Sequence, residues 1–360
     1  MKELYNKALD LQFLSIDEGL HLYENAPLAE LMQLGARLRQ IHVPGNAVSW
    51  QIDRNVNLTN VCVCQCSFCN FCCKPNSPEA YITLDEEYDK KIVELFKLGG
   101  KQLLLQGGMH PEHGLKFYVD LFTRLKKRYP DLMLHALGPP EIHYISEKEK
   151  ITYKKTLETL VAAGLDSLPG AGAEILSDRV RKIVSPAKCN KSQWIDVMKQ
   201  AHKMNLPTSA TMMFGHVETD REIVEHLHII RSIQANKPEN TYGFIAFIPW
   251  IFQRKGTKLE KKMNFRNTIT TQNYIRIIAI SRAMLPNIKN IQASWLTAGI
   301  DAGLLSLHAG ANDLGSIMIE ENVVSAAGAK HTIDADTMTK AISEAGFEPK
   351  LRNQKYEYIL

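Results

Sequence analysis

Apolar and polar positions follow two different periods along the chain. Wholly apolar runs of a few residues, such as 103–105, are typical of strands that are buried on both faces of a sheet. Longer segments with apolar residues three or four positions apart, such as 272–284, predict helices with one buried face. Thr83 and Glu86 form a capping box that opens such a helix, and Gly99 ends it. The two periods therefore predict strands and helices in alternation.

Eight strands are expected, each next to helical sequence. They lie at residues 48–58, 103–105, 132–137, 165–168, 208–214, 243–248, 288–293 and at the start of 316–327. Alternation of this kind predicts parallel strands joined by right-handed crossover helices. We expect an α/β fold, a (β/α)₈ TIM-type barrel, because a closed barrel leaves no sheet edge exposed. A partial barrel or a doubly wound sheet is the alternative.

The pattern also divides the chain into three parts. Residues 1–45 have charged helical sequence and are expected to form an N-terminal helical extension. Residues 46–330 hold the alternating pattern of the barrel, and residues 331–360 are expected to pack on the barrel as a C-terminal segment.

The charges of the chain are close to balanced. The 43 Lys and Arg residues against 39 Asp and Glu residues leave a formal net charge of +4, and no basic patch points to nucleic acid or an anionic membrane. The first ten residues lack the apolar stretch of a signal peptide, and the most apolar window, residues 243–252, is too short to span a bilayer. We expect a cytoplasmic protein whose partners include neither a membrane nor nucleic acid.

The cysteines are concentrated in one short segment. Six of the seven lie within residues 62–73, and only Cys189 lies elsewhere. Disulfides that stabilise a large domain would join distant segments, which thiols so close together cannot do. The distribution instead predicts a metal or cluster site in a reducing compartment.

Only one triple in this segment has the spacing CxxxCxxC, namely Cys62, Cys66 and Cys69. Three thiolates on a tight loop can hold three irons of a [4Fe–4S] cluster and leave the fourth iron open. A ferredoxin-type run would need a cysteine at position 76, where the chain has Asn76. A structural zinc site built from CxxC pairs is the alternative. The other cysteines of the segment are expected to be bystanders: Cys64, Cys72 and Cys73.

This loop resembles that of the radical S-adenosylmethionine (SAM) superfamily, with Phe68 before the last cysteine and the first strand before the loop. Further motifs narrow the resemblance to the cyclases of the futalosine route to menaquinone. They lie at residues 105–108, 135, 139–141, 172–176, 211–218, 247–250, 293–295, 310–313 and 321–328. The chain departs from the family at Cys72-Cys73, where aromatic or basic residues are usual.

The resemblance implies one [4Fe–4S] cluster with three cysteine ligands, and SAM bound to the open iron through its amino and carboxylate groups. A reduced partner such as flavodoxin or ferredoxin supplies one electron. The resulting 5′-deoxyadenosyl radical takes a hydrogen from ribose C4′ of a small nucleoside-like substrate, dehypoxanthine futalosine, and the new radical adds to the substrate's benzoate ring. A sibling reaction such as aminofutalosine synthesis is one alternative. A non-enzymatic iron–sulfur or zinc module is another.

The resemblance also implies roles for residues at the ends of strands, where chemistry sits in such folds. The residues expected to bind the cofactor are Phe68, Gln106, Gly107, Gly108 and Glu174. Those expected to act in catalysis, as the base or on the sugar, are His135, His216 and Asp313, with Glu141 and Glu218 also at strand ends. Each residue has a simpler interpretation, since the glycines suit a tight turn, Glu174 suits a helix start and Asp313 suits an Asx turn. A histidine in an apolar context is more often part of the core.

Overall fold

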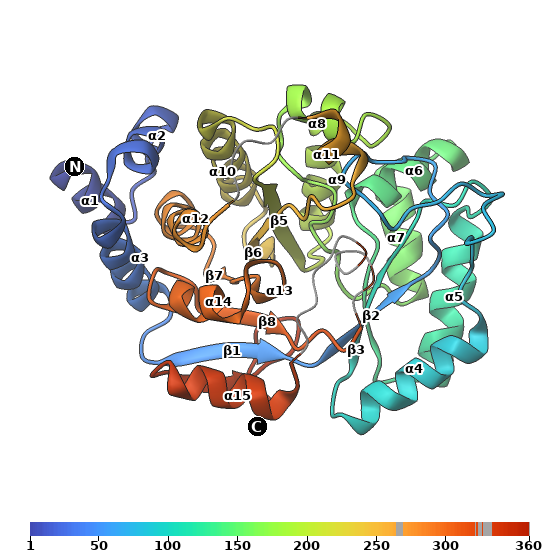
Figure 1. The fold of residues 1–360 in the computed structure, drawn as a ribbon. Helices are drawn as coiled ribbons and strands as arrows, with labels where there is room; N and C mark the ends of the chain where they lie inside the picture. Colours follow the sequence, from blue (N-terminus) through green and yellow to red (C-terminus); the bar gives the residue numbers. More distant parts are fainter. Residues whose placement is uncertain (264–268, 321, 323–325, 327–332, 360) are drawn as a thin grey trace.

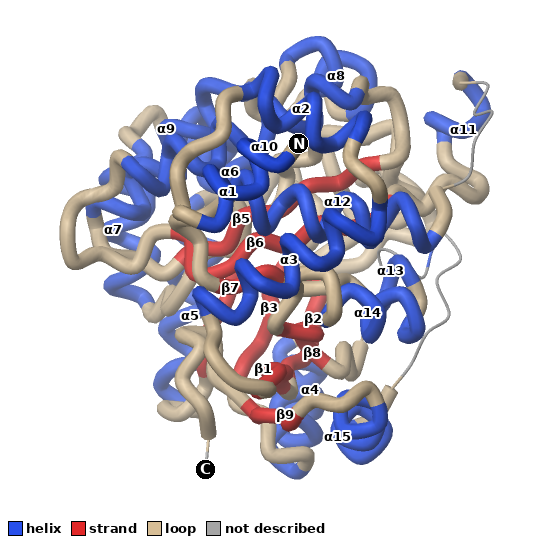
Figure 2. Tube along the Cα trace, turned by 90° about the vertical axis from the view of Figure 1, so that its left-hand side faces the viewer, coloured by secondary structure: helices blue, strands red, loops and turns tan. Residues whose placement is uncertain are grey.

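The computed structural model describes all 360 residues except 264–268, 321, 323–325, 327–332 and 360. Parallel strands lie at the centre and helices cover them on the outside (Figures 1 and 2). The strands are β1 (Ala47–Gln51), β2 (Asp53–Asn57), β3 (Gln102–Gln106), β4 (Met133–Ala136), β5 (Thr208–Phe214), β6 (Phe244–Ile251), β7 (Asn290–Ile291), β8 (Asp313–Ser316) and β9 (Glu348–Leu351). The described part of the chain contains no helix that is both long and apolar enough to cross a membrane.

Fifteen helices are assigned within the described residues. They are α1 (Lys2–Leu9), α2 (Ile16–Asn25), α3 (Leu28–His42), α4 (Asp85–Lys97), α5 (Leu115–Arg128), α6 (Pro139–Glu149), α7 (Tyr153–Ala163), α8 (Asp178–Val184), α9 (Lys191–Lys203), α10 (Asp220–Ala235), α11 (Lys258–Lys262), α12 (Thr271–Met284), α13 (Trp295–Ala298), α14 (Ile300–Leu307) and α15 (Ala335–Glu344). The N-terminal helices pack on the outside of the later ones, α3 against α12 and α2 against α10. Leu31, Leu34 and Leu38 recur at helical spacing and form the buried face of α3.

The strands form three sheets of three, with the orders β8-β1-β9, β2-β3-β4 and β5-β6-β7, and all pairs within them are parallel. Isolated parallel bridges connect the sheets. His135 of β4 pairs with Ser167, Leu168 pairs with Thr208 of β5, and Gln292 pairs with Asp313 of β8. Parallel pairing therefore passes from β2-β3-β4 through residues 167–168 to β5-β6-β7 and on to β8-β1-β9, and the chain itself continues from β1 into β2.

Several predicted elements differ in the structure. The strand expected at 165–168 is reduced to the two bridges at Ser167 and Leu168. The helix expected at 141–163 is two helices, α6 and α7, because Lys150 takes a left-handed conformation with φ of 54°. The helix expected at 173–184 begins only at Asp178, and the residues before it form an irregular loop. In the final expected stretch, 316–327, residues 321, 323–325 and 327 lie outside the described part.

The C-terminal residues supply a strand that the sequence analysis did not anticipate. β9 lies parallel to β1, with Ala47 paired to Glu348 and Trp50 paired to Leu351. The chain then turns beneath the strands, so that residues after β9 reach the interior between β1 and β4.

Candidate active site

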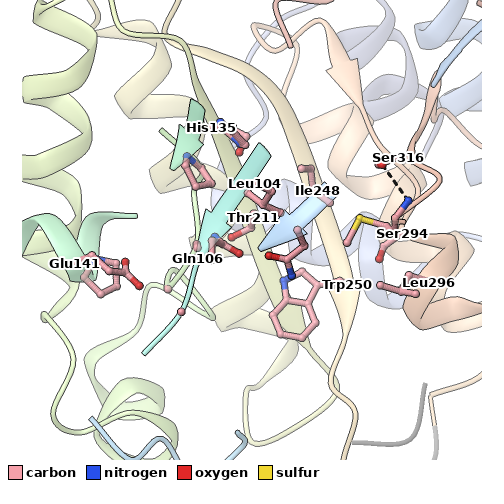
Figure 3. Close-up of a pocket in the computed structure, with 18 of the residues that line it drawn as sticks. Leu104, Gln106, His135, Glu141, Thr211, Ile248, Trp250, Ser294, Leu296 and Ser316 are labelled. Carbon is pink, nitrogen blue, oxygen red and sulfur yellow. Dashed lines mark hydrogen bonds between the residues drawn. The ribbon is translucent and has the colours of Figure 1, made fainter. Parts of the chain in front are cut away.

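A cavity of about 370 Å³ lies at the centre of the strands. The cysteine loop, the turn after β3, the start of α6 and the loop after Leu168 line one end, and residues from the C-terminal segment line the other. Figure 3 shows labelled side chains from β3, β4, β5 and β6 around this space, among them Gln106, His135, Thr211 and Trp250. A single cavity therefore connects the cysteine loop to the interior of the strands.

Backbone hydrogen bonds hold the cysteine loop in place. The Cys62 N–H donates to the Cys73 carbonyl at 3.2 Å, and the Val63 N–H donates to the Met109 carbonyl at 3.0 Å. The Ser67 N–H donates to the Val184 carbonyl at 2.9 Å, which ties the middle of the loop to the end of α8. The loop is thus fixed at both ends and in the middle before any ligand binds.

The three predicted ligands, Cys62, Cys66 and Cys69, all line the cavity. Cys72 lines it too, whereas Cys64 points away and donates to the Ala187 carbonyl at 3.2 Å. All seven cysteines are free thiols. Burial raises the pKa of Cys66 to about 12, whereas the hydrogen bond from Cys64 lowers the pKa of Cys62 to about 5.

The glycines after β3 are required by the cysteine loop. A Cβ at Gly108 would lie 2.1 Å from the Val61 carbonyl oxygen, and a Cβ at Gly107 would lie 3.0 Å from the Leu58 nitrogen. The Gly108 N–H donates to the Thr59 carbonyl at 2.7 Å. The turn therefore packs directly on the backbone that leads into the first ligand, and it lines the cavity with its other side.

Glu174 forms an ion pair at the wall of the cavity. It is 3% exposed, and its Oε1 accepts a hydrogen bond from Lys188 Nζ at 2.9 Å. Burial alone would raise the pKa of Glu174, but the Lys188 ammonium and the Arg181 guanidinium outweigh burial and lower it. The Lys188 ammonium also lies 5.3 Å from the centre of the Phe68 ring. One anion and one cation, both lining the cavity, thus lie beside the cysteine loop.

Of the three residues predicted to be catalytic, His135 lines the cavity. Its Nδ1 lies 2.7 Å from Ser167 Oγ and its Nε2 lies 3.4 Å from Gln354 Nε2. Burial, and then the nearby Arg352 guanidinium, lower the pKa of His135 to about 3. The ring is therefore neutral at pH 7, and it is better suited to hydrogen bonding than to accepting a proton as a general base.

His216 and Asp313 do not lie among the residues that line the cavity. His216 Nε2 lies 2.9 Å from the Met213 carbonyl oxygen, and its Nδ1 lies 2.9 Å from Glu218 Oε2, so the loop after β5 uses both ring nitrogens. Asp313 is fully buried and forms a two-point ion pair with Arg352, at 2.6 and 2.9 Å. Both residues hold the fold together around the cavity.

Glu141 occupies the first turn of α6 and lines the cavity. Its Oε2 has no hydrogen-bond partner in the protein. Burial raises the pKa of Glu141 to about 7, against the opposing effect of Lys188. A carboxyl group with this pKa can exchange a proton at neutral pH.

The floor of the cavity comes from the C-terminal segment. Arg352, Gln354 and Tyr356 line it, and Arg352 donates to Gln51 Oε1 at 2.6 Å. Gln354 Oε1 accepts a hydrogen bond from Gln102 at 3.0 Å. The sequence analysis missed these residues and Lys188, because no local motif marks them and only the fold brings them to the cavity.

Two family models match the chain. The radical SAM superfamily model matches residues 56–230, and the CofH/MqnC C-terminal region model matches residues 241–360. Together with a cysteine-lined cavity at one end of parallel strands, the first match defines the class of protein: a radical SAM enzyme.

Curated relatives cover nearly the whole chain. The cyclic dehypoxanthine futalosine synthase of Streptomyces coelicolor is 40% identical over 96% of this chain and 85% of the relative. That of Halalkalibacterium halodurans is 39% identical over 99% of this chain and 94% of the relative. The 5-amino-6-(D-ribitylamino)uracil–L-tyrosine 4-hydroxyphenyl transferase of Methanopyrus kandleri is 35% identical over 89% of this chain and 86% of the relative. The chain belongs to the radical SAM superfamily and, within it, to the CofH/MqnC family.

Solved structures agree on the fold. Methylornithine synthase superposes with a TM-score of 0.75 at 18% identity, covering 98% of both chains. A maturase of the [FeFe]-hydrogenase superposes with a TM-score of 0.74 at 15% identity, covering 98% of this chain and 76% of that chain. These similarities confirm a radical SAM TIM-type α/β fold.

Membership of the superfamily implies a [4Fe–4S] cluster and SAM. The residues around the cavity fit such a group, because thiols are the protein ligands of these clusters and three of them line one end of an open space. Within the described residues no three His, Cys, Asp or Glu side chains are grouped as the ligands of a single metal ion are.

Proposed function

We propose that this enzyme converts dehypoxanthine futalosine to its cyclic product, in menaquinone biosynthesis. The observation that supports this most directly is the 40% and 39% identity to two cyclic dehypoxanthine futalosine synthases over nearly the whole chain. The transferase relatives are less similar, at 35% for the Methanopyrus kandleri protein and 38% for one Methanosarcina mazei protein.

Cys62, Cys66 and Cys69 hold the cluster in this proposal. They share the spacing CxxxCxxC, line the same cavity and lie on a loop that the backbone fixes. When bound, the cluster and SAM supply a 5′-deoxyadenosyl radical. Phe68, Gln106, Gly107, Gly108 and Glu174 bind SAM, because all five line the cavity next to the three thiols.

The overall reaction balances without an external oxidant. The substrate gives one hydrogen atom to form 5′-deoxyadenosine, one proton to a base and one electron back to the oxidised cluster. SAM and the substrate thus yield methionine, 5′-deoxyadenosine, a product with two hydrogens fewer and one proton. A reduced flavodoxin or ferredoxin starts the first turnover with one electron.

The chain's own residues position the substrate and receive the proton. Leu104, Ile248 and Trp250 give the cavity an apolar wall that limits the access of water. Glu141 accepts the proton, because its Oε2 is unpartnered in the cavity and its pKa lies near 7. His135 remains neutral and holds the wall of the cavity through its contacts with Ser167 and Gln354. His216 and Asp313 support the surrounding loops and take no part in the chemistry.

The proposal includes a closed (β/α)₈ barrel. The pairings of β1 with β8, β2 with β3, and the bridges at Ser167, Leu168 and Gln292 support closure, with residues 167–168 in the position of the fourth strand. It also includes residues 1–45 as a helical extension and residues 331–360 as a segment packed on the barrel. A cytoplasmic location suits the seven free thiols, since a reducing compartment keeps them so.

The experiment uses reconstituted, reduced enzyme with SAM and dehypoxanthine futalosine under anaerobic conditions. We expect one 5′-deoxyadenosine for each product molecule, and a product mass two hydrogens below that of the substrate. Parallel reactions offer 5-amino-6-(D-ribitylamino)uracil with L-tyrosine. Turnover of that pair without turnover of the futalosine derivative would assign the transferase activity instead.

A substrate-free control measures uncoupled cleavage of SAM. Stoichiometric zinc without the visible absorbance of an iron–sulfur cluster in anaerobically purified protein would contradict both enzymatic assignments. These measurements therefore separate the cyclase, the transferase and a module without catalytic activity.

A further inference from the structure

Two buried polar side chains of β2 line the cavity, and one side-chain oxygen of each has no hydrogen-bond partner in the protein. Asp53 and Asn55 are each 3% exposed, and both line the cavity. Asp53 Oδ1 and Asn55 Oδ1 accept no hydrogen bond from any protein group. Buried oxygens of this kind are rare in folded proteins, and in a cavity they indicate a ligand that donates hydrogen bonds.

The two oxygens belong to a continuous polar column. Gln51, Asp53 and Asn55 occupy alternate positions at the junction of β1 and β2, and all three line the cavity. Gln51 Nε2 donates to Asp53 Oδ2 at 2.9 Å, and Gln102 Nε2 lies 3.4 Å from the same oxygen. One carboxylate oxygen of Asp53 is therefore fixed by the protein, and the other has no hydrogen-bond partner in the protein.

The nearby cation cannot serve as the missing partner. Arg352 donates to Asp313 through Nε and Nη2, to Gln51 and the Asn353 carbonyl through Nη1, and to Tyr356 through Nη2. All five of its N–H groups are thus engaged. Burial raises the pKa of Asp53, so a ligand hydroxyl that donates to Oδ1 would favour the charged carboxylate.

The position of this column separates it from the cluster. Asp53 starts β2 and Asn57 ends it, and the cysteine loop follows Asn57. At about 3.3 Å per residue the strand is roughly 13 Å long from the first residue to the last. The unpartnered oxygens therefore lie toward the floor, whereas the residues proposed to bind SAM lie around the cysteine loop.

We propose that Asp53 and Asn55 form a subsite that accepts hydrogen bonds from the sugar-derived hydroxyl groups of the substrate. This inference rests on the proposed function, whose substrate contains a ribose. The transferase relatives are named for a D-ribitylamino uracil, which also carries hydroxyl groups on a ribose-derived chain.

The test compares the parent ligand and its deoxy analogues on four forms of the holoenzyme. The ligands are dehypoxanthine futalosine and analogues in which one ribose hydroxyl is replaced by hydrogen. The proteins are the wild type, Asp53→Asn and Asn55→Leu, which keep side-chain volume and remove the charge or the acceptor. Ser146→Ala is the matched control, since Ser146 is buried and hydrogen-bonded to Thr156 outside the cavity.

We expect Asp53→Asn to weaken binding of the parent ligand by roughly 10- to 100-fold, as expected for a lost hydrogen bond to a charged group. For one deoxy analogue, wild type and Asp53→Asn should bind with nearly equal affinity. The dissociation constant for SAM and the visible absorbance of the cluster should match those of wild type in both variants. Ser146→Ala should change the affinity for no ligand.

The outcomes distinguish a failure of the subsite assignment from a failure of the proposed function. The subsite assignment is wrong if the wild type converts the futalosine derivative but each variant lowers the affinity for the parent ligand and for every deoxy analogue by the same factor. Weaker SAM binding in the variants would show that the two oxygens bind the cofactor. Unchanged binding of both the substrate and SAM would show that they bind only water. If the wild type instead turns over the ribitylamino uracil, the proposed function fails, and the same comparison on its deoxy analogues decides the subsite.

Discussion

Replacing Gly108 by alanine tests how closely the turn after β3 supports the cluster ligands. The added Cβ would lie 2.1 Å from the Val61 carbonyl oxygen and 3.1 Å from Cys62 Cβ. Ordinary contact begins at about 3.4 Å, so the two segments must separate by about 3.4 − 2.1 = 1.3 Å. Gly108 does not have a positive φ, so the effect is steric and does not come from the backbone conformation of alanine.

The cysteine loop cannot make this movement freely. Val61 N–H donates to Thr59 Oγ1 at 3.1 Å, and the neighbouring Cys62 N–H donates to Cys73. Overpacking of this kind costs about 1–3 kcal/mol of stability. A displacement of about 1 Å at a catalytic group lowers the rate by on the order of 100-fold. We therefore expect a folded protein with a displaced Cys62 and little catalysis.

The assay measures bound iron, visible absorbance and 5′-deoxyadenosine formed per enzyme. Gly107→Ala provides a graded comparison, because its closest contact of 3.0 Å requires a shift of only about 3.4 − 3.0 = 0.4 Å. We expect Gly108→Ala to lose most iron and at least about 100-fold in activity, with Gly107→Ala in between. Full iron content and wild-type activity in Gly108→Ala would refute the argument that the turn supports the loop.

Three further predictions concern other parts of the site. Cys66→Ala should abolish cluster binding and SAM cleavage, whereas Cys73→Ala should retain most of both, measured by iron content and 5′-deoxyadenosine. Asp313→Asn should lower the free energy of unfolding by about 3 kcal/mol in urea titrations, because it leaves the buried Arg352 charge without its anion. The pKa of Glu141 is raised by burial to about 7 in the folded protein, so this group's contribution to stability is lost as pH rises from about 4.5 to 7. Glu141→Gln should therefore remove about 3 kcal/mol of that pH dependence in unfolding experiments on SAM-free protein.

Each of these predictions has a result that contradicts it. Equal damage from Cys73→Ala and Cys66→Ala would mean that the ligands are misassigned. A loss of less than about 1 kcal/mol in Asp313→Asn would show that Arg352 is solvated. The same fall in stability between pH 5 and 8 in Glu141→Gln and wild type would place the titration on another group.

The proposed cluster ligands lie in one short loop, so the sequence alone places them close together. Cys62, Cys66 and Cys69 are seven residues apart from first to last, so local chain geometry alone brings them to the same cavity. The helical period likewise predicted α12, although the structure buries residues 277–284 on every side of this helix and not on one face alone. Family motifs then identified the superfamily, which the comparisons confirm.

Other parts of the site depended on distant segments. Asp313 looked like a catalytic strand-end residue, but its partner Arg352 lies 39 residues further along the chain and turns it into a buried ion pair. His216 likewise follows a strand, and its two ring nitrogens contact the Met213 carbonyl and the Glu218 carboxylate. Neither partnership leaves a periodic signal in the sequence.

The sequence by itself determined the alternation of strands and helices, the cysteine triple and the family, because periodicity and short spacings are properties of neighbouring residues. Only the tertiary structure decided that β9 joins β1, that Lys188 pairs with Glu174, and that Asp53 and Asn55 face the cavity with unpartnered oxygens. The physical reason is that hydrogen bonds and ion pairs depend on which side chains meet after folding. Their energies are then set by burial, which no single position in the sequence reveals.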